Sequence, residues 1–556
     1  MKTVNSQVKS THTTMDEACQ MMSQTKIDSS DLFSSDSDSS SSDSNSVSIS
    51  SLTPMGKEEA RVYGHHMKLL ARSDGQQELG DAATTPIFTM PVLEHVKTHT
   101  AKGSETPFAQ YGLLGGQANG FPAMADSKAL DPKKELDPRV FFNITSPSST
   151  FICGSQGSGK SHTLSCLLEN SLFPSPANQL RHPLTGLVFH YDTFISDDGG
   201  SPCEAAFLSS SKGVKVRVLC APTNIATIKK AYHQFKNVTI EPLRINQSDL
   251  NTKRMLDLMA VNQANGPVPL YVHTIYRILR VMRLKQQETG GTFDYVLFKK
   301  HVDAAGLSFN QLRPLQQRLD TLESFMPQGQ TIAPPSKAKG KSGPTTGNDW
   351  TPKAGTLTIV DLSCPCVTPE GACALFNICL SIFLEKSTSV GRVIALDEAH
   401  KYMNASSETS TLTETLLATI RLQRHLGARI IISTQEPTIS PALLDLSSVT
   451  IVHRFTSPEW LKALEGHLAG AASKLLRTDD NEDGGQQISI ATKVFGEIVK
   501  LRVGEALLFS PSAIIAVDNG ARKTGTDGLK RLGAGFLKIR IRSRLTTDGG
   551  KSVMAT

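Results

Sequence analysis

The sequence predicts an α/β protein with a largely parallel sheet, and three observations carry that prediction. Short apolar and β-branched runs recur over residues 138–243 and again over 356–455. Between 149 and 172, a strand-like run leads into a glycine-rich loop and then into apolar residues at helical spacing. The later runs are apolar at nearly every position, which is typical of strands covered on both faces, and helical patterns separate them.

Length and composition set wide bounds. The chain has 556 residues, enough for two or three domains, and its hydrophobic fraction of 39% and charged fraction of 20% are ordinary for a globular protein. No run of about 18 apolar residues occurs, so we expect no membrane partner. Residues 1–20 lack an apolar core and carry acidic residues, which argues against a secretion signal or transit peptide. The nine cysteines are scattered, so we expect a reducing cytoplasmic or nuclear compartment.

The charge is distributed unevenly. Residues 1–50 hold three lysines and seven carboxylates, a net charge of −4 in a chain of net charge +6, so the remainder carries +10. A mildly basic body permits a polyanionic partner. The Ser/Asp-rich composition of residues 1–55 predicts a disordered tail, which is either a solvated leader or a phosphorylated segment.

Changes in composition predict the domain organisation. After the tail, residues 56–137 form an N-terminal segment of unclear fold, with an amphipathic helix over 57–73 that leaves His65 and His66 at the surface. The later segments are a first α/β part at 138–249, an all-helical insertion at 250–327, a flexible linker at 328–355, a second α/β part at 356–520 and a basic C-terminal segment at 521–556. In the last segment, alternation places four cations on one face of a strand: Lys538, Arg540, Arg542 and Arg544.

Residues 151–164, FICGSQGSGKSHTL, match the phosphate-binding pattern G-x-x-x-x-G-K-[ST]. In such a loop, backbone N–H groups at a helix N-terminus converge on phosphate oxygens, and glycines let the backbone wrap closely. Lys160 would reach the β- and γ-phosphates of ATP, and the Ser161 hydroxyl would hold Mg²⁺. The residues expected to bind nucleotide are Gly154, Ser155, Gln156, Gly157, Ser158, Gly159, Lys160, Ser161 and His162.

A second motif, RVIALDEAH at 392–400, ends an apolar strand in two carboxylates. The strand would carry both to its C-terminal edge, where ligands bind in open α/β sheets. Asp397 is expected to hold Mg²⁺, and Glu398 is expected to orient and deprotonate the attacking water. Together with the phosphate-binding loop, this pattern predicts ATP binding and hydrolysis.

Three further polar residues follow. Gln435 ends another apolar strand. It either contacts the γ-phosphate or the attacking water, or it is only a polar residue that caps the end of the strand. Arg421 and Arg424 are three residues apart, so they lie on one face of a helix. They are either an arginine finger, acting in the same or a neighbouring subunit, or part of a solvated basic face. Four cysteines within 364–379 lack zinc-site spacing, so we interpret them as buried thiols. They are Cys364, Cys366, Cys373 and Cys379.

The order of these motifs resembles the HerA/FtsK superfamily of P-loop motors, and its HerA-like members most. The segment IRLQRHLGARIIISTQEPTISPALLDLSSVTIVHRFTSPEW is similar to that superfamily's block after the carboxylate strand, and GEALLFSP (504–511) to its closing strand. The resemblance covers about 138–265 and 355–515. It implies an additional-strand RecA-like P-loop NTPase core, a homo-oligomeric, hexameric ring with shared ATP sites, and translocation of double-stranded DNA. In that picture Arg421 or Arg424 acts on a neighbour's nucleotide.

Three hypotheses follow for the function. The first is a ring-forming ATPase that translocates DNA, motivated by the motif order and the basic C-terminal strand. The second is an ATPase that remodels a protein partner or acts as a nucleotide switch, with the helical insertion and acidic tail as interaction surfaces. The third, a protein that binds nucleotide without hydrolysis, is disfavoured because Lys160 and Glu398 are both present.

Overall fold

The computed structural model describes residues 57–70, 80–100, 106–118, 137–194, 196, 200–258, 270–331, 346–387, 389–404, 406–464, 490–517 and 528–549. The chain divides into two units, residues 1–71 and 72–556. The described part of the first unit is helix α2 (Lys57–Leu70), which confirms the predicted helix, with His65 and His66 exposed. The predicted disordered tail at 1–55 lies outside the described residues.

The second unit is built on one sheet, in the order β15-β14-β1-β3-β2-β16-β13-β12-β4-β11-β10-β6-β9-β7-β8, with β5 paired to β2. Its eight strands from β12 to β8 are all parallel, which confirms the predicted fold class. These strands are β12 (Val449–His453), β4 (Ser149–Cys153), β11 (Ala428–Thr434), β10 (Arg392–Leu396), β6 (Thr185–His190), β9 (Thr356–Asp361), β7 (Lys215–Cys220) and β8 (Val238–Pro242).

The strand order identifies the fold as RecA-like. β11 lies between β4, which leads into the phosphate-binding loop, and β10, which ends before Asp397. One strand therefore separates the two motifs in the sheet, as the additional-strand arrangement requires. Each motif still follows the carboxyl end of its strand, so both reach the same edge of the sheet.

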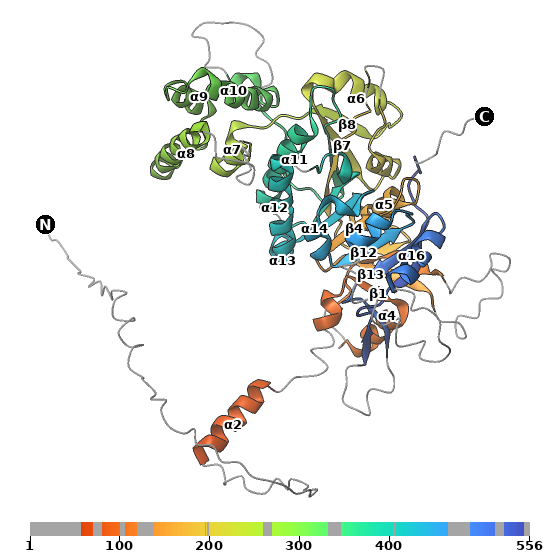
Figure 1. Ribbon diagram of the computed structural model, residues 1–556. Helices are drawn as coiled ribbons and strands as arrows, with labels where there is room; N and C mark the ends of the chain where they lie inside the picture. Colours follow the sequence, from red (N-terminus) through yellow and green to blue (C-terminus); the bar gives the residue numbers. More distant parts are fainter. Residues whose placement is uncertain are drawn as a thin grey trace, which may run out of the picture. The chain divides into compact units, whose positions relative to one another are not determined.

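Helices cover both faces of the parallel strands (Figure 1). Along β10, Ile394 and Leu396 pack on one face, and Val393 and Ala395 on the other, because strand side chains alternate. The first face carries α11 (Pro369–Glu385), α12 (Ser407–Arg421), α13 (Gln423–Leu426), α14 (Pro441–Asp445) and α16 (Ile490–Lys500). The second carries α5 (Lys160–Leu172), η2 (Glu204–Ser210) and α6 (Ile225–Ala231).

The predicted all-helical insertion is present between β8 and β9. It consists of α7 (Thr252–Leu258), α8 (Leu270–Thr289), α9 (Tyr295–Asp303) and α10 (Phe309–Ser324). Asp294 caps α9 by accepting a hydrogen bond from Leu297 N at 2.9 Å. Buried residues such as Leu279, Phe298 and Leu319 belong to the same apolar core as α11 and the sheet. No helix in the described parts of the chain is long and apolar enough to cross a membrane.

The N-terminal segment, for which the sequence predicted no fold, extends the sheet by pairing that is antiparallel except between β1 and β14, which are parallel. Its elements are β1 (Ile87–Thr89), α4 (Met90–His99) and β2 (Tyr111–Gln117). They join strands from the rest of the chain: β3 (Arg139–Asn143), β5 (Asn178–Gln179), β13 (Glu505–Phe509), β14 (Ile514–Val517), β15 (Leu529–Arg531) and β16 (Leu537–Ile541). A small separate core forms here, in which the Phe88 and Phe108 rings stack at 3.9 Å.

Cys364, Cys373 and Cys379 are buried thiols, as predicted. Cys366 is exposed, so the prediction was wrong for that residue. It sits in the turn before α11, where its side chain faces solvent rather than the helix core.

The C-terminal segment differs from its predicted basic strand face. β16 ends at Ile541, so Arg542 and Arg544 lie in the segment that follows and turn inward. Arg544 pairs with Glu204, and Lys538 Nζ lies 3.9 Å from Glu497. Of the four predicted surface cations, only Arg540 is fully exposed, whereas the other three are partly buried.

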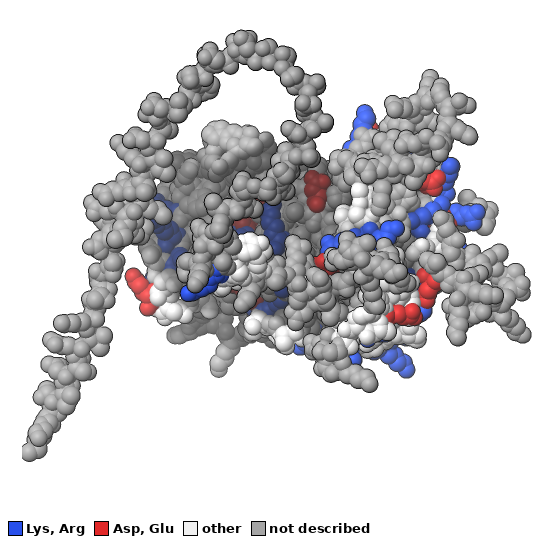
Figure 2. All heavy atoms as spheres, turned by 90° about the horizontal axis from the view of Figure 1, so that it is seen from below, with Lys and Arg blue, Asp and Glu red and all other residues white. Residues whose placement is uncertain are grey.

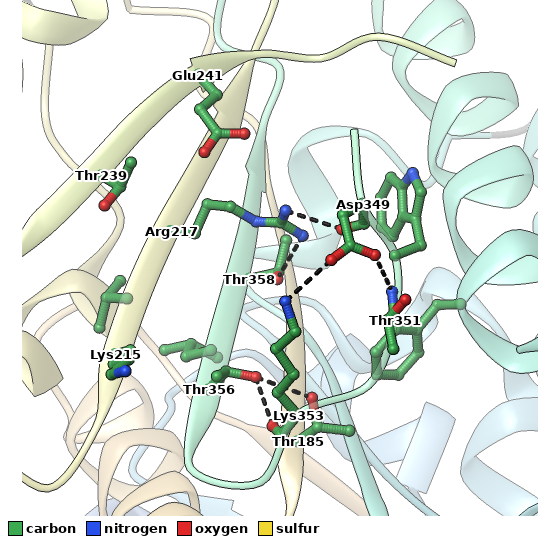
Figure 3. A pocket seen from close by; sticks show the side chains of 14 residues that line it. Thr185, Lys215, Arg217, Thr239, Glu241, Asp349, Thr351, Lys353, Thr356 and Thr358 are labelled. Atoms are coloured by element: carbon green, nitrogen blue, oxygen red, sulfur yellow. Dashed lines mark hydrogen bonds and ion pairs between the residues drawn. The ribbon is translucent and has the colours of Figure 1, made fainter. Parts of the chain in front are cut away.

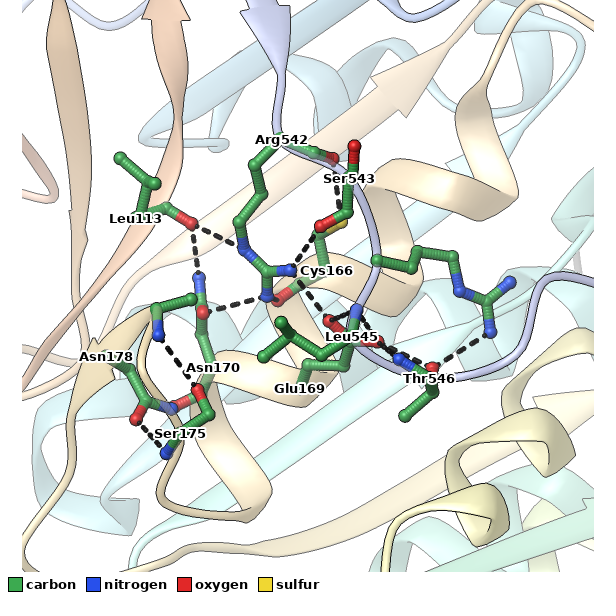
Figure 4. A network of polar contacts seen from close by, with 12 residues as sticks. Leu113, Cys166, Glu169, Asn170, Ser175, Asn178, Arg542, Ser543, Leu545 and Thr546 are labelled. Carbon is green, nitrogen blue, oxygen red and sulfur yellow. Dashed lines mark hydrogen bonds and ion pairs between the residues drawn. The ribbon is translucent and has the colours of Figure 1, made fainter. Parts of the chain in front are cut away.

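Figure 4 shows how Arg542 clamps the C-terminal segment onto α5. Its guanidinium donates to the Glu169 carboxylate at 2.8 Å, to Asn170 Oδ1 at 3.0 Å and to three backbone carbonyls, including that of Leu113. The Glu169 side chain is 0% exposed and also accepts from the backbone N–H groups of Leu545 and Thr546. Every charge in this cluster therefore has a partner, as burial requires.

We predict that Arg542→Ala destabilises the protein by about 3–5 kcal/mol, because it leaves the Glu169 carboxylate buried and unpaired. Arg540→Ala is the matched control, because it removes an exposed arginine two residues away. It should change the free energy of unfolding by less than about 0.5 kcal/mol. Urea denaturation of both variants measures the difference. Equal midpoints for the two variants would contradict the clamp.

Candidate nucleotide-binding site

The phosphate-binding loop connects β4 to α5 and needs its glycines. Gly154, Gly157 and Gly159 have φ values of 151°, 71° and 116°, which side chains rarely adopt. A Cβ atom at Gly154 would also lie 2.6 Å from His453 Cβ on β12. The loop backbone therefore approaches β12 closely enough to exclude any side chain at Gly154.

Hydrogen bonds within the chain hold the loop in shape. Ser155 donates from its backbone N–H and from its hydroxyl to the Arg454 carbonyl, at 2.9 and 2.8 Å. The Ser158 hydroxyl donates to the Ser155 carbonyl at 2.7 Å. Lys160 Nζ lies 3.3 Å from the same carbonyl, so its side chain folds back across the loop. Gln156 and Gly157 are exposed at the rim.

Asp397 lies at the sheet edge directly after β10 and is 2% exposed. Its Oδ1 atom is buried and has no hydrogen-bond partner among the described residues, whereas Oδ2 lies 3.5 Å from His190 Nδ1. One carboxylate oxygen is therefore available to a cation. Carboxylate and hydroxyl oxygens are the ligands that Mg²⁺ prefers, so Asp397 and Ser161 fit the predicted metal.

Glu398 has a left-handed backbone, with φ 47° and ψ 46°, and is the one non-glycine residue with positive φ in the described ranges. Such a conformation costs about 1–3 kcal/mol and is found mainly at functional sites. It ends the strand abruptly and begins the turn to α12. Burial, and then the charge of Asp397, raise the pKa of Glu398, whereas Lys160 opposes that rise. Burial lowers the pKa of Lys160, and Glu398 and Asp397 oppose that change.

His400 belongs to the site, although the sequence did not single it out. Its Nδ1 accepts a hydrogen bond from Gln435 N at 3.3 Å and lies 3.4 Å from Glu398 Oε2. Burial and then the charge of Lys160 lower the pKa of His400 to about 4, so the ring is neutral near pH 7. His400 thus links the turn after β10 to the end of β11. The sequence feature that could have identified His400 is its position two residues after Glu398.

His162 is placed differently from the other predicted loop residues. Its ring Nε2 lies 2.8 Å from the Arg542 carbonyl, so the side chain turns toward the C-terminal segment. Any contact of His162 with a nucleotide would come from its backbone N–H at the start of α5. Ser161 is partly exposed beside it.

Arg421 and Arg424 do not join the site of their own chain. They lie at the end of α12 and in α13, immediately before β11 begins at Ala428. β11 has seven residues, so this end of the strand is roughly 20 Å from the loop edge. Both arginines are exposed, and neither has an ion pair within the described ranges. Both guanidinium groups thus lie at the opposite end of β11 from the glycine-rich loop of their own chain.

No family model and no curated protein matches this sequence. Among solved structures, VirB4 of Thermoanaerobacter pseudethanolicus is 14% identical, covers 80% of this chain and 97% of its own, and has a TM-score of 0.37. The plasmid coupling protein TrwB, solved with ADP and Mg²⁺, is 13% identical at the same coverages, with a TM-score of 0.40.

The genome packaging NTPase B204 from Sulfolobus turreted icosahedral virus 2, solved with ATP-gammaS, is 16% identical. It covers 28% of this chain and 61% of its own, with a TM-score of 0.19. The fold itself is defined by this chain's own strand order and by the glycine-rich loop between β4 and α5, which are those of an additional-strand RecA-like P-loop fold.

We predict that Lys160→Ala weakens ATP binding roughly 10- to 100-fold, because a charge-assisted hydrogen bond contributes about 1.5–3 kcal/mol. Titration with a fluorescent ATP analogue measures the loss. Lys236→Ala removes an exposed lysine away from the loop and should bind as wild type does. Unchanged affinity in Lys160→Ala would contradict the site.

Glu398→Gln should retain ATP affinity but lower steady-state turnover by about 10²–10⁴-fold, because the amide cannot accept the proton of the attacking water. Phosphate release under saturating ATP is the measurement. Wild-type turnover in this variant would refute the role of the carboxylate.

Proposed function

We propose that the protein is an ATP-hydrolysing P-loop motor that uses Mg²⁺. The observation that carries this proposal is that Lys160, Asp397 and Glu398 lie together at one sheet edge, where one oxygen of Asp397 has no hydrogen-bond partner in the described part of the chain. A buried lysine facing two carboxylates beside a glycine-lined loop suits a triphosphate and its metal.

Each side chain has a task in this proposal. Lys160 leaves the Ser155 carbonyl and binds the β- and γ-phosphates, while the loop N–H groups hold the phosphate oxygens. Ser161 and Asp397 hold the metal, which when bound neutralises charge on the β- and γ-phosphates. Glu398 orients a water for in-line attack and accepts its proton.

Gln435 lies between the two motifs at the end of β11, where its side chain would contact the γ-phosphate or the water. Its backbone N–H is tied to His400, which lies beside Glu398. This link would couple occupation of the phosphate site to the position of the carboxylate.

A ring of identical subunits would complete each site. Arg421 and Arg424 are exposed and remote from their own loop, so they can reach a γ-phosphate only on a neighbouring copy. The hexameric state itself comes from the superfamily resemblance.

We therefore predict complementation between two inactive variants. Arg421→Ala/Arg424→Ala should bind ATP but turn over at least about 10³-fold more slowly, as expected on losing an arginine finger. Mixing it with Lys160→Ala should restore part of the ATPase activity, because mixed rings pair an intact loop with an intact arginine. No recovery after subunit exchange, with ring assembly intact, would count against the shared site.

Double-stranded DNA is the proposed substrate, and α8 supplies the surface that favours it. Arg277, Arg280, Arg283 and Lys285 are exposed and have no ion pair with any described residue. The three arginines recur at every third position along the helix, with the 51%-exposed ring of Tyr276 beside them. Such a row of cations suits a phosphate backbone.

Other surfaces support a DNA contact less well. Arg542 and Arg544, which motivated the DNA hypothesis, are paired internally. On the face shown in Figure 2, Lys and Arg side chains are interspersed with Asp and Glu in the described part. The arginine row on α8 is therefore the proposed contact.

We predict that Arg277→Ala/Arg280→Ala/Arg283→Ala lowers DNA affinity and reduces the slope of log K against log salt by about 3, one unit per phosphate contact. ATPase activity without DNA should remain unchanged, because α8 is not part of the nucleotide site. Lys212→Ala/Lys229→Ala/Lys236→Ala removes the same charge from exposed positions near α6 and is the matched control. Equal salt slopes for the two triple variants would contradict the α8 contact.

A protein substrate is the alternative. The insertion exposes Val281, Leu284 and Phe309 at 55%, 60% and 67%. Apolar side chains of this size at a surface are typical of protein contacts when they cluster. ATPase activity that double-stranded DNA leaves unchanged would favour this alternative.

A cavity lies at the opposite edge of the sheet from the loop. It has a volume of about 180 Å³ and is lined by the first residues of β6, β7 and β9. Figure 3 shows Arg217 and Lys353 there, both bonded to Asp349. Because the cavity lies at the other end of the strands from the glycine-rich loop, we assign it no part in the proposed function.

A further inference from the structure

A row of buried polar side chains lies behind the metal-binding carboxylate. β6 is the strand between β10 and β9, and His190, its last residue, is in register with Asp361, the last residue of β9. On the other side, Asp397 N donates to the Phe189 carbonyl at 3.0 Å, which places Asp397 beside His190. The imidazole therefore lies between two carboxylates. Asp397, His190 and Asp361 are 2%, 5% and 1% exposed.

Two residues from outside the strands, Cys203 and Tyr232, connect the two carboxylates of this row. The Cys203 thiol donates to Asp397 Oδ2 at 3.7 Å, and the Cys203 N–H donates to the Tyr232 hydroxyl at 2.9 Å. The Tyr232 hydroxyl donates in turn to Asp361 Oδ2 at 2.6 Å. Cys203 is fully buried and Tyr232 almost so. Hydrogen bonds therefore link Asp397 through Cys203 and Tyr232 to Asp361, and His190 lies between the two carboxylates.

The two oxygens of Asp397 have different surroundings. Oδ2 accepts from the Cys203 thiol at 3.7 Å and lies within ion-pair distance, 3.5 Å, of His190 Nδ1. Oδ1 is buried and has no hydrogen-bond partner among the described residues, and neither ring nitrogen of His190 has one there. Within the described residues, His190, Cys203 and Asp397 also form the one cluster with metal-ligand types. Imidazole and thiol are poor ligands for Mg²⁺, so they do not replace oxygen donors at the metal.

We propose that His190, assisted by Cys203, is the positioning residue of Asp397. It holds Oδ2 and so directs Oδ1 toward the metal bound with the nucleotide. Residues that hold a metal ligand from behind fix its orientation, and their loss typically reduces metal affinity 10- to 100-fold. This inference rests on the proposed Mg²⁺-dependent ATPase and adds a residue that the motifs did not contain.

The test measures nucleotide binding rather than turnover. A fluorescent ATP analogue is titrated in EDTA and in a series of Mg²⁺ concentrations, with the full-length protein. In EDTA, the nucleotide affinity of His190→Phe should be within about twofold of that of the wild-type protein. The Mg²⁺ concentration that produces half of the metal-dependent increase in nucleotide affinity should be roughly 10- to 100-fold higher in this variant. His190→Asn, whose amide can donate near the former Nδ1 position, should recover most of the loss. His233→Phe, an exposed histidine, is the matched control.

A second pair of variants keeps the test decisive if His190→Phe does not fold. Cys203→Ser retains a donor toward Asp397 and should keep the wild-type Mg²⁺ requirement, whereas Cys203→Ala should raise it. A wild-type Mg²⁺ requirement in folded His190→Phe, or in Cys203→Ala, overturns the positioning role. Failure of the proposed function itself is distinct, because the wild-type protein would then show no Mg²⁺-dependent gain in nucleotide affinity.

Discussion

The constraint on which the site depends is the parallel alignment of β4, β11, β10 and β6. Parallel strands bring their carboxyl ends to one edge, and here that edge holds the phosphate-binding loop, Gln435, the two carboxylates and His190 in adjacent positions. Each of these groups therefore lies within a few residues of the end of its strand, so short connections are sufficient to bring them together. The apolar runs that form the strands therefore also position the chemistry, because both faces of the sheet must be covered for the strands to pack this way.

Local strain and buried charge are concentrated at this edge. Glu398 has a left-handed backbone, and Lys160 is buried 3.3 Å from a carbonyl of its own loop. Burial shifts the pKa values of Lys160 and Glu398 toward their neutral forms, and their mutual attraction opposes this. A bound triphosphate and cation would add the opposing charges that such a cluster lacks. The arrangement is typical of a site preorganised for a charged ligand.

Arg542 and Arg544 of the C-terminal segment form ion pairs with carboxylates of the same chain. Arg542 and Glu169 tie residues 542–546 to α5, the helix that begins at Lys160, and His162 contacts the same segment. The end of the chain thus stabilises the helix whose N-terminus forms the phosphate site. A stretch that is basic in sequence need not be a basic surface, because pairing with buried carboxylates neutralises it.

The sequence by itself determined the fold class, the phosphate-binding loop, the two carboxylates and the extents of most parallel strands. Each of these depends on residues that are neighbours in the chain, so spacing and apolar pattern were sufficient. The tertiary structure alone decided the pairing of Arg542 with Glu169, the distance of Arg421 and Arg424 from their own site, and the contacts of Asp397 with Cys203 and His190. Cys203 and Asp397 are 194 residues apart, and nothing local in the chain marks one as the partner of the other. Contacts between strands and helices distant in sequence arise from the order in which the sheet assembles, which no local pattern encodes.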